Sequence, residues 1–133
     1  MRVFLDTNVL VSAFATRGLC ADVLRHVISE HELLVGEFVL DELLPVLRKR
    51  IHLPDKAVDG IESFLRGYEV IPKPKHPSDV KIRDPDDAWI LASAIAGKAD
   101  VLVSGDPDLQ VLGKRSPVSV MSPREYWSSV SGA

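Results

Sequence analysis

Short apolar, β-branched runs alternate along this chain with longer amphipathic stretches, and the alternation limits the fold more than any other feature. The runs predict strands over residues 2–6, 33–35, 68–71, 101–104 and 118–121. The longer stretches predict helices over residues 8–15, 20–29, 37–50, 54–66, 86–97 and 107–112, and a last helix that Ser122 and Pro123 open and that extends through Trp127. This order favours an α/β fold, a mostly parallel sheet with helices on both faces.

Proline and glycine residues mark several boundaries. Pro54 stands in the first turn of its predicted helix, where proline is tolerated, and Gly97 is typical of a helix end. Pro45 falls inside the helix predicted over residues 37–50. It should kink or restart that helix, because proline has no backbone N–H to donate.

The composition indicates one domain over residues 1–133. At about 150 residues per domain the length makes about one, and the hydrophobic fraction of 46% and charged fraction of 26% exclude disordered and fibrous classes. A lone Cys20 excludes an internal disulfide and a cysteine-based zinc site. Apolar runs stay well short of the roughly 18 residues of a membrane helix, and Asp6 comes too early for a signal peptide. We therefore expect a soluble, cytoplasmic protein.

Charge is distributed unevenly. The formal net charge of −3, from 16 Lys and Arg against 19 Asp and Glu, gives no general basic surface for nucleic acid. Residues 79–108 contain seven Asp and no Glu, whereas the basic residues gather at 48–50, 73–83 and 114–115. The acidic segment is therefore the first place to look for a site.

Two acidic residues follow predicted strands. Asp6 ends the first strand, and Asp106 comes shortly after the fourth. The carboxyl ends of parallel strands meet at one edge of an open α/β sheet, where such folds bind ligands, so both acids should lie there. Each could instead be only the N-cap of the helix that follows it, and Pro107 suits such a cap.

Further acids lie on predicted helices. At about 100° per residue, Asp87 falls on the inward apolar stripe of its helix and Asp86 lies off it. A carboxylate on a buried stripe costs free energy unless it is paired or binds a metal. The alternative is a capping arrangement in which Asp84 is the N-cap, although that pattern favours Glu or Gln at the position of Asp87. Glu42 lies at the margin of its stripe, which by itself is typical of a solvated residue.

Carboxylates that meet in one pocket repel and raise one another's pKa values, so such a cluster makes sense if a divalent cation neutralises it. All-oxygen ligands suit Mg²⁺ or Mn²⁺, one or two ions, rather than zinc. This chemistry favours metal-assisted phosphoryl transfer or phosphodiester hydrolysis and does not choose between them. The sequence has no P-loop, dinucleotide-binding or nucleophile-elbow motif, and its four His lack metal-ligand spacing.

Segments from one end of the chain to the other resemble PIN-domain nucleases. They are VFLDTNVL at 3–10, DPDDAWILASA at 84–94, ADVLVSGDPDL at 99–109 and VSVMSPREY at 118–126. The length suits the VapC-type toxins of prokaryotic toxin–antitoxin pairs. The resemblance implies a PIN-like three-layer α/β/α sandwich and a Mg²⁺- or Mn²⁺-dependent endoribonuclease that hydrolyses single-stranded RNA to 5′-phosphate and 3′-hydroxyl ends.

The resemblance also implies roles for individual residues. The catalytic and metal-binding acids are Asp6, Glu42, Asp87 and Asp106, with Asp108 as an outer ligand. The residues that steady the acids or the attacking water are Thr7, Asn8 and Ser104, and Asp84 is an outer ligand besides its expected capping role. Pro45 departs from the family pattern and could displace Glu42.

Partners follow from the same resemblance. A cognate antitoxin, often with a basic side chain inserted into the acidic pocket, and a homodimer are implied. Because the chain is acidic overall, RNA must be held by local basic groups, for which the candidates are Arg48, Lys49, Arg50, Lys114 and Arg115. Two other functions fit the same acids: a structure-specific DNA nuclease, and a catalytically silent module whose acidic pocket docks a basic partner.

Overall fold

The computed structural model describes residues 1–131 and contains every predicted strand and helix in the predicted order. The strands are β1 (Arg2–Leu5), β2 (Glu32–Gly36), β3 (Glu69–Ile71), β4 (Val101–Val103) and β5 (Ser119–Met121). The helices are α1 (Thr7–Ala15), α2 (Leu19–Glu30), α3 (Glu37–Lys49), α4 (Asp55–Arg66), α5 (Pro85–Ala96), α6 (Pro107–Gln110) and α7 (Pro123–Val130). The bounds agree with the predicted ones to within one residue, except that α6 ends earlier and α7 extends further.

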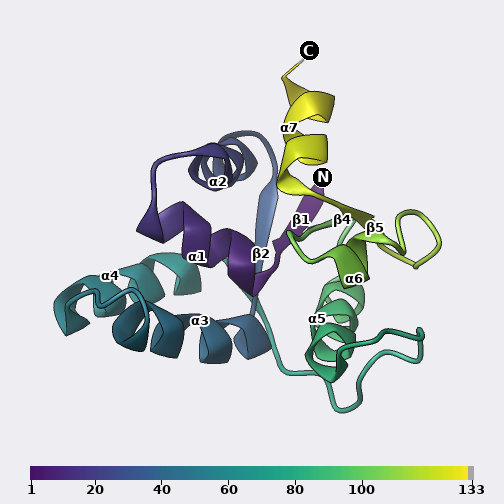
Figure 1. The fold of residues 1–133 in the computed structure, drawn as a ribbon, viewed down its shortest axis with the longest axis horizontal. Coiled ribbons are helices and arrows are strands. Elements are labelled where there is room, and N and C mark those ends of the chain that lie inside the picture. Colours follow the sequence, from purple (N-terminus) through teal and green to yellow (C-terminus); the bar gives the residue numbers. More distant parts are fainter. Residues whose placement is uncertain (132–133) are drawn as a thin grey trace.

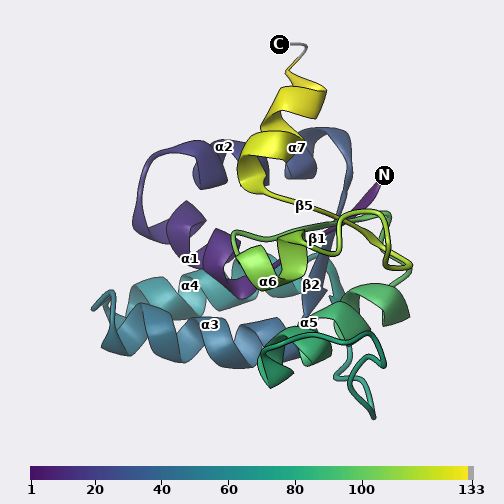
Figure 2. The same ribbon diagram turned by 45° about the vertical axis from the view of Figure 1, so that its right-hand side comes forward.

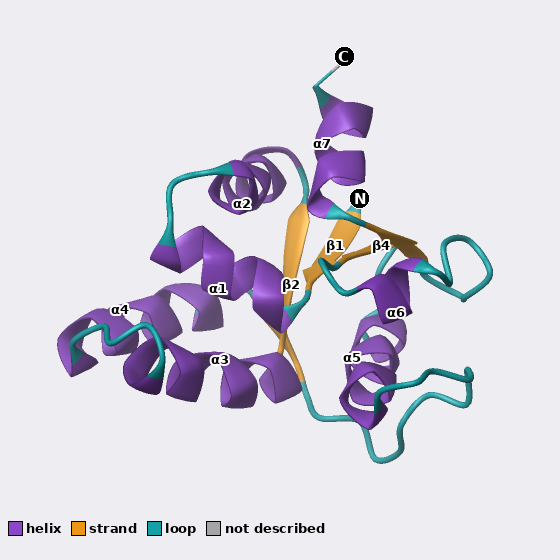
Figure 3. Cartoon of the chain, viewed as in Figure 1, coloured by secondary structure: helices purple, strands orange, loops and turns teal. Residues whose placement is uncertain are grey.

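The strands form one five-stranded sheet in the order β3-β2-β1-β4-β5, and every neighbouring pair is parallel, which confirms the predicted sheet (Figure 3). At its centre, Val3 of β1 pairs with Leu33 on one side and Val101 on the other. Val3, Phe4 and Leu5 are all buried, because helices cover both faces of a central parallel strand.

The helices make the outer layers of the sandwich. Successive crossovers from β1 to β3 run in one direction along the sheet, and the connection to β4 returns across it. Because such crossovers are right-handed, α1 to α4 lie on one face and α5 on the other (Figures 1 and 2). At the end of the chain, α7 packs against α2, where the buried Tyr126 hydroxyl and His26 Nδ1 are hydrogen-bonded at 2.8 Å.

The prediction that Pro45 restarts its helix is wrong, because α3 runs unbroken from Glu37 to Lys49. Proline leaves the carbonyl of Asp41 without its usual intrahelical donor. Asp41 and Pro45 are both exposed, so water can satisfy that carbonyl. Leu40, Leu43 and Leu47 on the other side are fully buried and hold the helix against the sheet.

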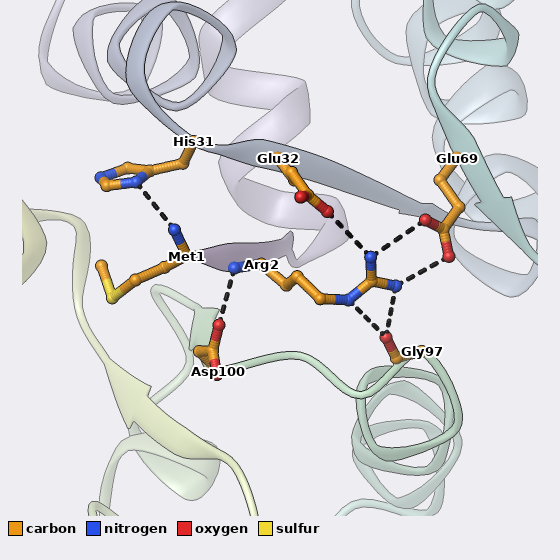
Figure 4. A network of polar contacts seen from close by, with 7 residues as sticks. All are labelled: Met1, Arg2, His31, Glu32, Glu69, Gly97 and Asp100. Carbon is orange, nitrogen blue, oxygen red and sulfur yellow. Dashed lines mark hydrogen bonds and ion pairs between the residues drawn. The ribbon is translucent and has the colours of Figure 1, made fainter.

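The amino ends of the strands are tied together by Arg2 (Figure 4). Its guanidinium donates to Glu32 of β2 at 2.9 Å, to Glu69 of β3 at 2.7 Å, and to the carbonyl of Gly97 after α5 at 2.7 Å. Its backbone N–H donates to Asp100 at 2.8 Å. Hydrogen bonds and ion pairs of Arg2 therefore join three strands and the end of α5 at this edge of the sheet. Within residues 1–131, no helix has both the length and the apolar character to cross a membrane.

Candidate active site

A cleft of about 410 Å³ opens at the carboxyl edge of the sheet, where β1 and β4 end between α1, α3 and α5. Its lining is acidic at one end, with Asp6, Glu42, Asp84, Asp86, Asp87 and Asp106. The other lining residues are Thr7, Asn8, Val11, Ser12, Val46, Arg50 and Ile90. All four acids that the family resemblance singled out thus meet in one cleft.

Asp6 lies directly after the central strand and is only 5% exposed. Its Oδ1 accepts a hydrogen bond from the Thr7 N–H at 2.7 Å, so Asp6 is the N-cap of α1, and its Oδ2 accepts from the Ser104 hydroxyl at 2.6 Å. Burial raises the pKa of Asp6 despite these bonds, and the charge of Asp106 raises it further. Asp6 is thus an N-cap, as the alternative proposed, but it is not only a cap, because it also lines the cleft.

Ser104 links the acids of the two strand ends. Its buried hydroxyl donates to Asp6 and accepts from the backbone N–H of Asp106 at 3.0 Å. Asp106 in turn caps α6 by accepting from the Asp108 N–H at 2.8 Å. On the other side, Asn8 Oδ1 accepts from the Gly105 N–H at 3.2 Å, which fixes the loop that carries Asp106 to the start of α1.

Asp87 is the acid of the cluster that has a buried carboxylate oxygen without a hydrogen-bond partner among the described residues. It lies in the first turn of α5, is 6% exposed, and its Oδ2 is buried with no hydrogen-bond partner among the described residues. Burial, then the nearby carboxylate of Asp106, and then those of Asp6 and Asp84, raise the pKa of Asp87 to about 8. A buried, unpartnered carboxylate oxygen of this kind is what a cation would satisfy.

Three carboxylates lie close enough to hold one ion. Oxygens of Asp84, Asp87 and Asp106 all lie within 4.8 Å of one another. The donors are all oxygen, which fits Mg²⁺ or Mn²⁺ better than zinc. The residues present therefore fit a divalent cation. Asp84 has two roles here, because its Oδ1 also accepts from the Asp86 N–H at 3.0 Å as the predicted N-cap of α5.

Glu42 reaches the cleft from α3 in spite of Pro45. The Thr7 hydroxyl donates to Glu42 Oε1 at 2.7 Å and so joins this carboxylate to the residue after Asp6. Burial raises the pKa of Glu42, and so do the charges of Asp6, Asp86 and Asp84, although the Thr7 bond lowers it. Glu42, at the margin of the apolar stripe of α3, therefore lines the cleft and is half-buried.

The other predicted site residues divide into two groups. Arg50 lines the cleft, whereas Lys49, Lys114, Arg115 and Asp108 do not, and Arg48 is paired with Asp55 at 3.2 Å. Sequence reasoning missed Asp86, which lies off the apolar stripe of α5 yet lines the cleft. The apolar stripe of a helix indicates only its buried face, and an exposed acid such as Asp86 can line a cleft without lying on that stripe.

A family model described as a PIN domain matches residues 2–108, and the chain belongs to this family. A comparison with curated proteins found no significant match.

Solved structures share the fold. VapBC2 from Rickettsia felis, solved bound to a DNA fragment from its promoter, matches with a TM-score of 0.67 and 18% identity over 92% of this chain and 98% of that one. VapC20 from Mycobacterium tuberculosis, a sarcin–ricin loop cleaving toxin, matches with a TM-score of 0.59 and 16% identity, over 84% of this chain and 95% of that one. FitAcB from Neisseria gonorrhoeae matches with a TM-score of 0.59 and 17% identity, over 92% of this chain and 98% of that one. At these identities the likeness shows the PIN-like α/β/α fold that the sequence predicts.

Proposed function

We propose that this protein is a metal-dependent endoribonuclease that hydrolyses phosphodiester bonds of single-stranded RNA, and that it is the cytoplasmic toxin of a VapC-type toxin–antitoxin pair. The observation that carries the proposal is the buried, unpartnered Oδ2 of Asp87 within 4.8 Å of ligand oxygens from Asp84 and Asp106. Membership of the PIN family and the fold shared with VapC20, a loop-cleaving toxin, support it.

Each acid has a distinct task in this proposal. Asp84, Asp87 and Asp106 would hold Mg²⁺ or Mn²⁺, which when bound would supply Lewis acidity toward a water and the phosphate. Asp6, the N-cap of α1, and Glu42 of α3 would orient the attacking water or a second ion. Asp108 is at most an outer ligand, because only its backbone N–H touches the cluster, through Asp106.

Hydroxyl groups keep those carboxylates in place. The Ser104 hydroxyl donates to Asp6, and the Thr7 hydroxyl donates to Glu42. The Thr7 hydroxyl donates to one oxygen of Glu42 only, whereas Asp6 accepts at both of its oxygens, from the Thr7 N–H and from Ser104. Residues that orient ligands in this way commonly tune metal affinity by about 10- to 100-fold.

We also propose that the protein binds a basic segment of an antitoxin and forms a homodimer. An acidic cleft attracts Lys or Arg from a partner protein by charge complementarity. Such a segment would compete with the cation for the same carboxylates. Inhibition that added Mn²⁺ relieves is therefore the expected behaviour of the antitoxin.

The decisive experiment is cleavage of a mixed single-stranded RNA pool by chelator-treated protein, with and without Mn²⁺. Asp87→Asn is the test variant, because it removes the charge with almost no change of shape. Asp79→Asn, an exposed acid of the loop before α5, is the matched control. Cleavage by the wild type and by Asp79→Asn, lost with chelator and in Asp87→Asn, supports the proposal.

The other outcomes separate the alternatives. Equal cleavage by Asp87→Asn identifies a contaminating nuclease. Cleavage of flapped DNA but not of RNA favours a structure-specific DNA nuclease. Metal binding with no cleavage of either substrate, together with tight binding of a basic peptide, favours the docking module.

A further inference from the structure

We infer that Arg50 binds an RNA phosphate that neighbours the cleaved one and so sets the path of the strand along the cleft; this inference rests on the proposed function. Among the residues that line the cleft, within the described part of the chain, Arg50 is the one basic side chain. It stands at the end of α3, away from the carboxylates.

The placement follows from the spacing along α3. Glu42, Val46 and Arg50 are separated by four residues each, so they share one face of the helix, and all three line the cleft. At about 1.5 Å per residue, the backbone of Arg50 lies about 12 Å along the helix from that of Glu42. The guanidinium therefore serves a phosphate beyond the acidic end, and the cleaved phosphate stays with the acids.

Apolar side chains also line the cleft, and one of them lies between Glu42 and Arg50 along α3. They are Val11 of α1, Val46 of α3 and Ile90 of α5. Aliphatic side chains suit the sugar and the face of a base, which carry no charge. Along α3 the order is thus the Glu42 carboxylate, the apolar Val46 and the Arg50 guanidinium, which matches a cleaved phosphate, a nucleoside and the next phosphate.

Arg50 is also available for this task. Among residues 1–131, no carboxylate forms an ion pair with it, whereas its neighbour Arg48 is held by Asp55 at 3.2 Å and by Asp59 at 3.5 Å. Guanidinium matches phosphate with two parallel hydrogen bonds, which a surface lysine cannot reproduce.

The test measures binding of a labelled, randomised single-stranded RNA 12-mer by fluorescence anisotropy over a range of salt concentrations. All proteins carry Asp87→Asn and are measured with Mg²⁺, with the RNA checked to be intact. Added to this background are Arg50→Gln, Arg50→Lys and, as the matched control, Arg124→Gln, an exposed arginine of α7.

We expect Arg50→Gln to weaken binding about five- to tenfold and to reduce the slope of log K against log salt by about 0.7, the value for one phosphate on a single strand. Arg50→Lys should restore the slope, and Arg124→Gln should leave affinity and slope as they were. An Arg50→Gln slope equal to that of Arg124→Gln overturns the inference, as does a complete absence of RNA binding.

Cleavage by the otherwise wild-type protein separates this inference from the proposed function. If RNA binding depends on Arg50 but the wild type never cleaves RNA, the nuclease proposal fails and the role of Arg50 stands. If the wild type cleaves and Arg50→Gln does so with an unchanged KM, the nuclease proposal stands and Arg50 has no such role.

Discussion

At the scale of single residues, Ser104 decides how two catalytic candidates lie relative to each other. Its hydroxyl is fully buried and serves Asp6 as donor and the Asp106 N–H as acceptor. Ser104→Ala leaves both groups without a partner, so we expect the free energy of unfolding to fall by about 1–3 kcal/mol and the affinity for Mn²⁺ to fall about tenfold.

Ser93 provides the matched control for this prediction. It is equally buried, but its hydroxyl donates only to the Trp89 carbonyl one turn earlier in α5. Ser93→Ala should therefore change the free energy of unfolding by less than about 0.5 kcal/mol. Urea unfolding of both variants, with calorimetric titration of Mn²⁺, checks the pair. Equal Mn²⁺ affinities in the two variants would count against a positioning role for Ser104.

The second residue-scale prediction concerns the pH dependence of the metal-free protein. The pKa of Asp87 is about 8 in the folded chain and far lower in the unfolded chain. The folded state therefore holds more protons between these values, and its stability falls as pH rises through the acidic and neutral range up to about 8. Asp87→Asn removes this loss, so the variant should be more stable than the wild type at pH 8 and similar to it near pH 4.

Thermal melts in chelator from pH 4 to pH 8.5 measure the effect. A gain of at least about 1–2 kcal/mol at pH 8 corresponds to a Tm increase of at least about 4–8 °C for a domain of this size. The control Asp79→Asn should follow the wild-type curve, since Asp79 is exposed. A melting temperature of Asp87→Asn below that of the wild type at pH 8 would show that this carboxylate stabilises the empty site.

At the scale of elements, α3 contains a proline between two residues that we propose act in the cleft, Glu42 and Arg50, the C-cap. Pro45 lies between Glu42 and Arg50 on an otherwise regular helix and is exposed. Pro45→Ala restores an intrahelical hydrogen bond, so we expect the free energy of unfolding to rise by about 1–2 kcal/mol, less than the full cost of an interior proline because the unfolded chain becomes more flexible.

The catalytic consequence of Pro45→Ala should be small. The Thr7 hydroxyl holds Glu42 from outside α3, so the position of the carboxylate does not depend on the proline. Chemical denaturation and the Mn²⁺-dependent cleavage rate check both statements. A loss of activity together with a gain of stability would mean that Pro45 sets the angle at which Glu42 enters the cleft.

The elements also show how much of the site could be predicted from the sequence. Strand ends located Asp6 and Asp106, and the apolar stripe located Asp87, because both signals depend only on local periodicity and sheet topology. Glu42 needed the family resemblance, since the rim of a cleft is indistinguishable from solvent on a helical wheel. Asp86 and the isolation of Arg50 depend on how α3 and α5 meet across the sheet edge, which the spacing within either helix does not determine.

At the scale of the whole molecule, the two edges of the sheet have opposite tasks. At the amino edge, Arg2 donates to the carboxylates of Glu32 and Glu69 and to the carbonyl of Gly97, the residue after α5. At the carboxyl edge, Asp84, Asp87 and Asp106 have no basic neighbour within ion-pair distance among residues 1–131. The parallel topology predicts which edge carries the candidate site. The ion pairs of Arg2 with Glu32 and Glu69 at the other edge could not be predicted, because no sequence pattern indicates them.

This unequal distribution of charge predicts that a divalent cation stabilises the whole fold. A ligand that binds only the folded state adds about 2.7 kcal/mol at 100 times its Kd, so saturating Mn²⁺ should raise Tm by roughly 8–10 °C at pH 7. Asp87→Asn should lose most of that increase, and Asp79→Asn should keep it. Calorimetric melts with and without Mn²⁺ make the comparison. An equal increase in all three proteins would place the bound ion outside the cleft, and no increase in any of them would mean that protonation, rather than a metal, relieves the repulsion between the carboxylates.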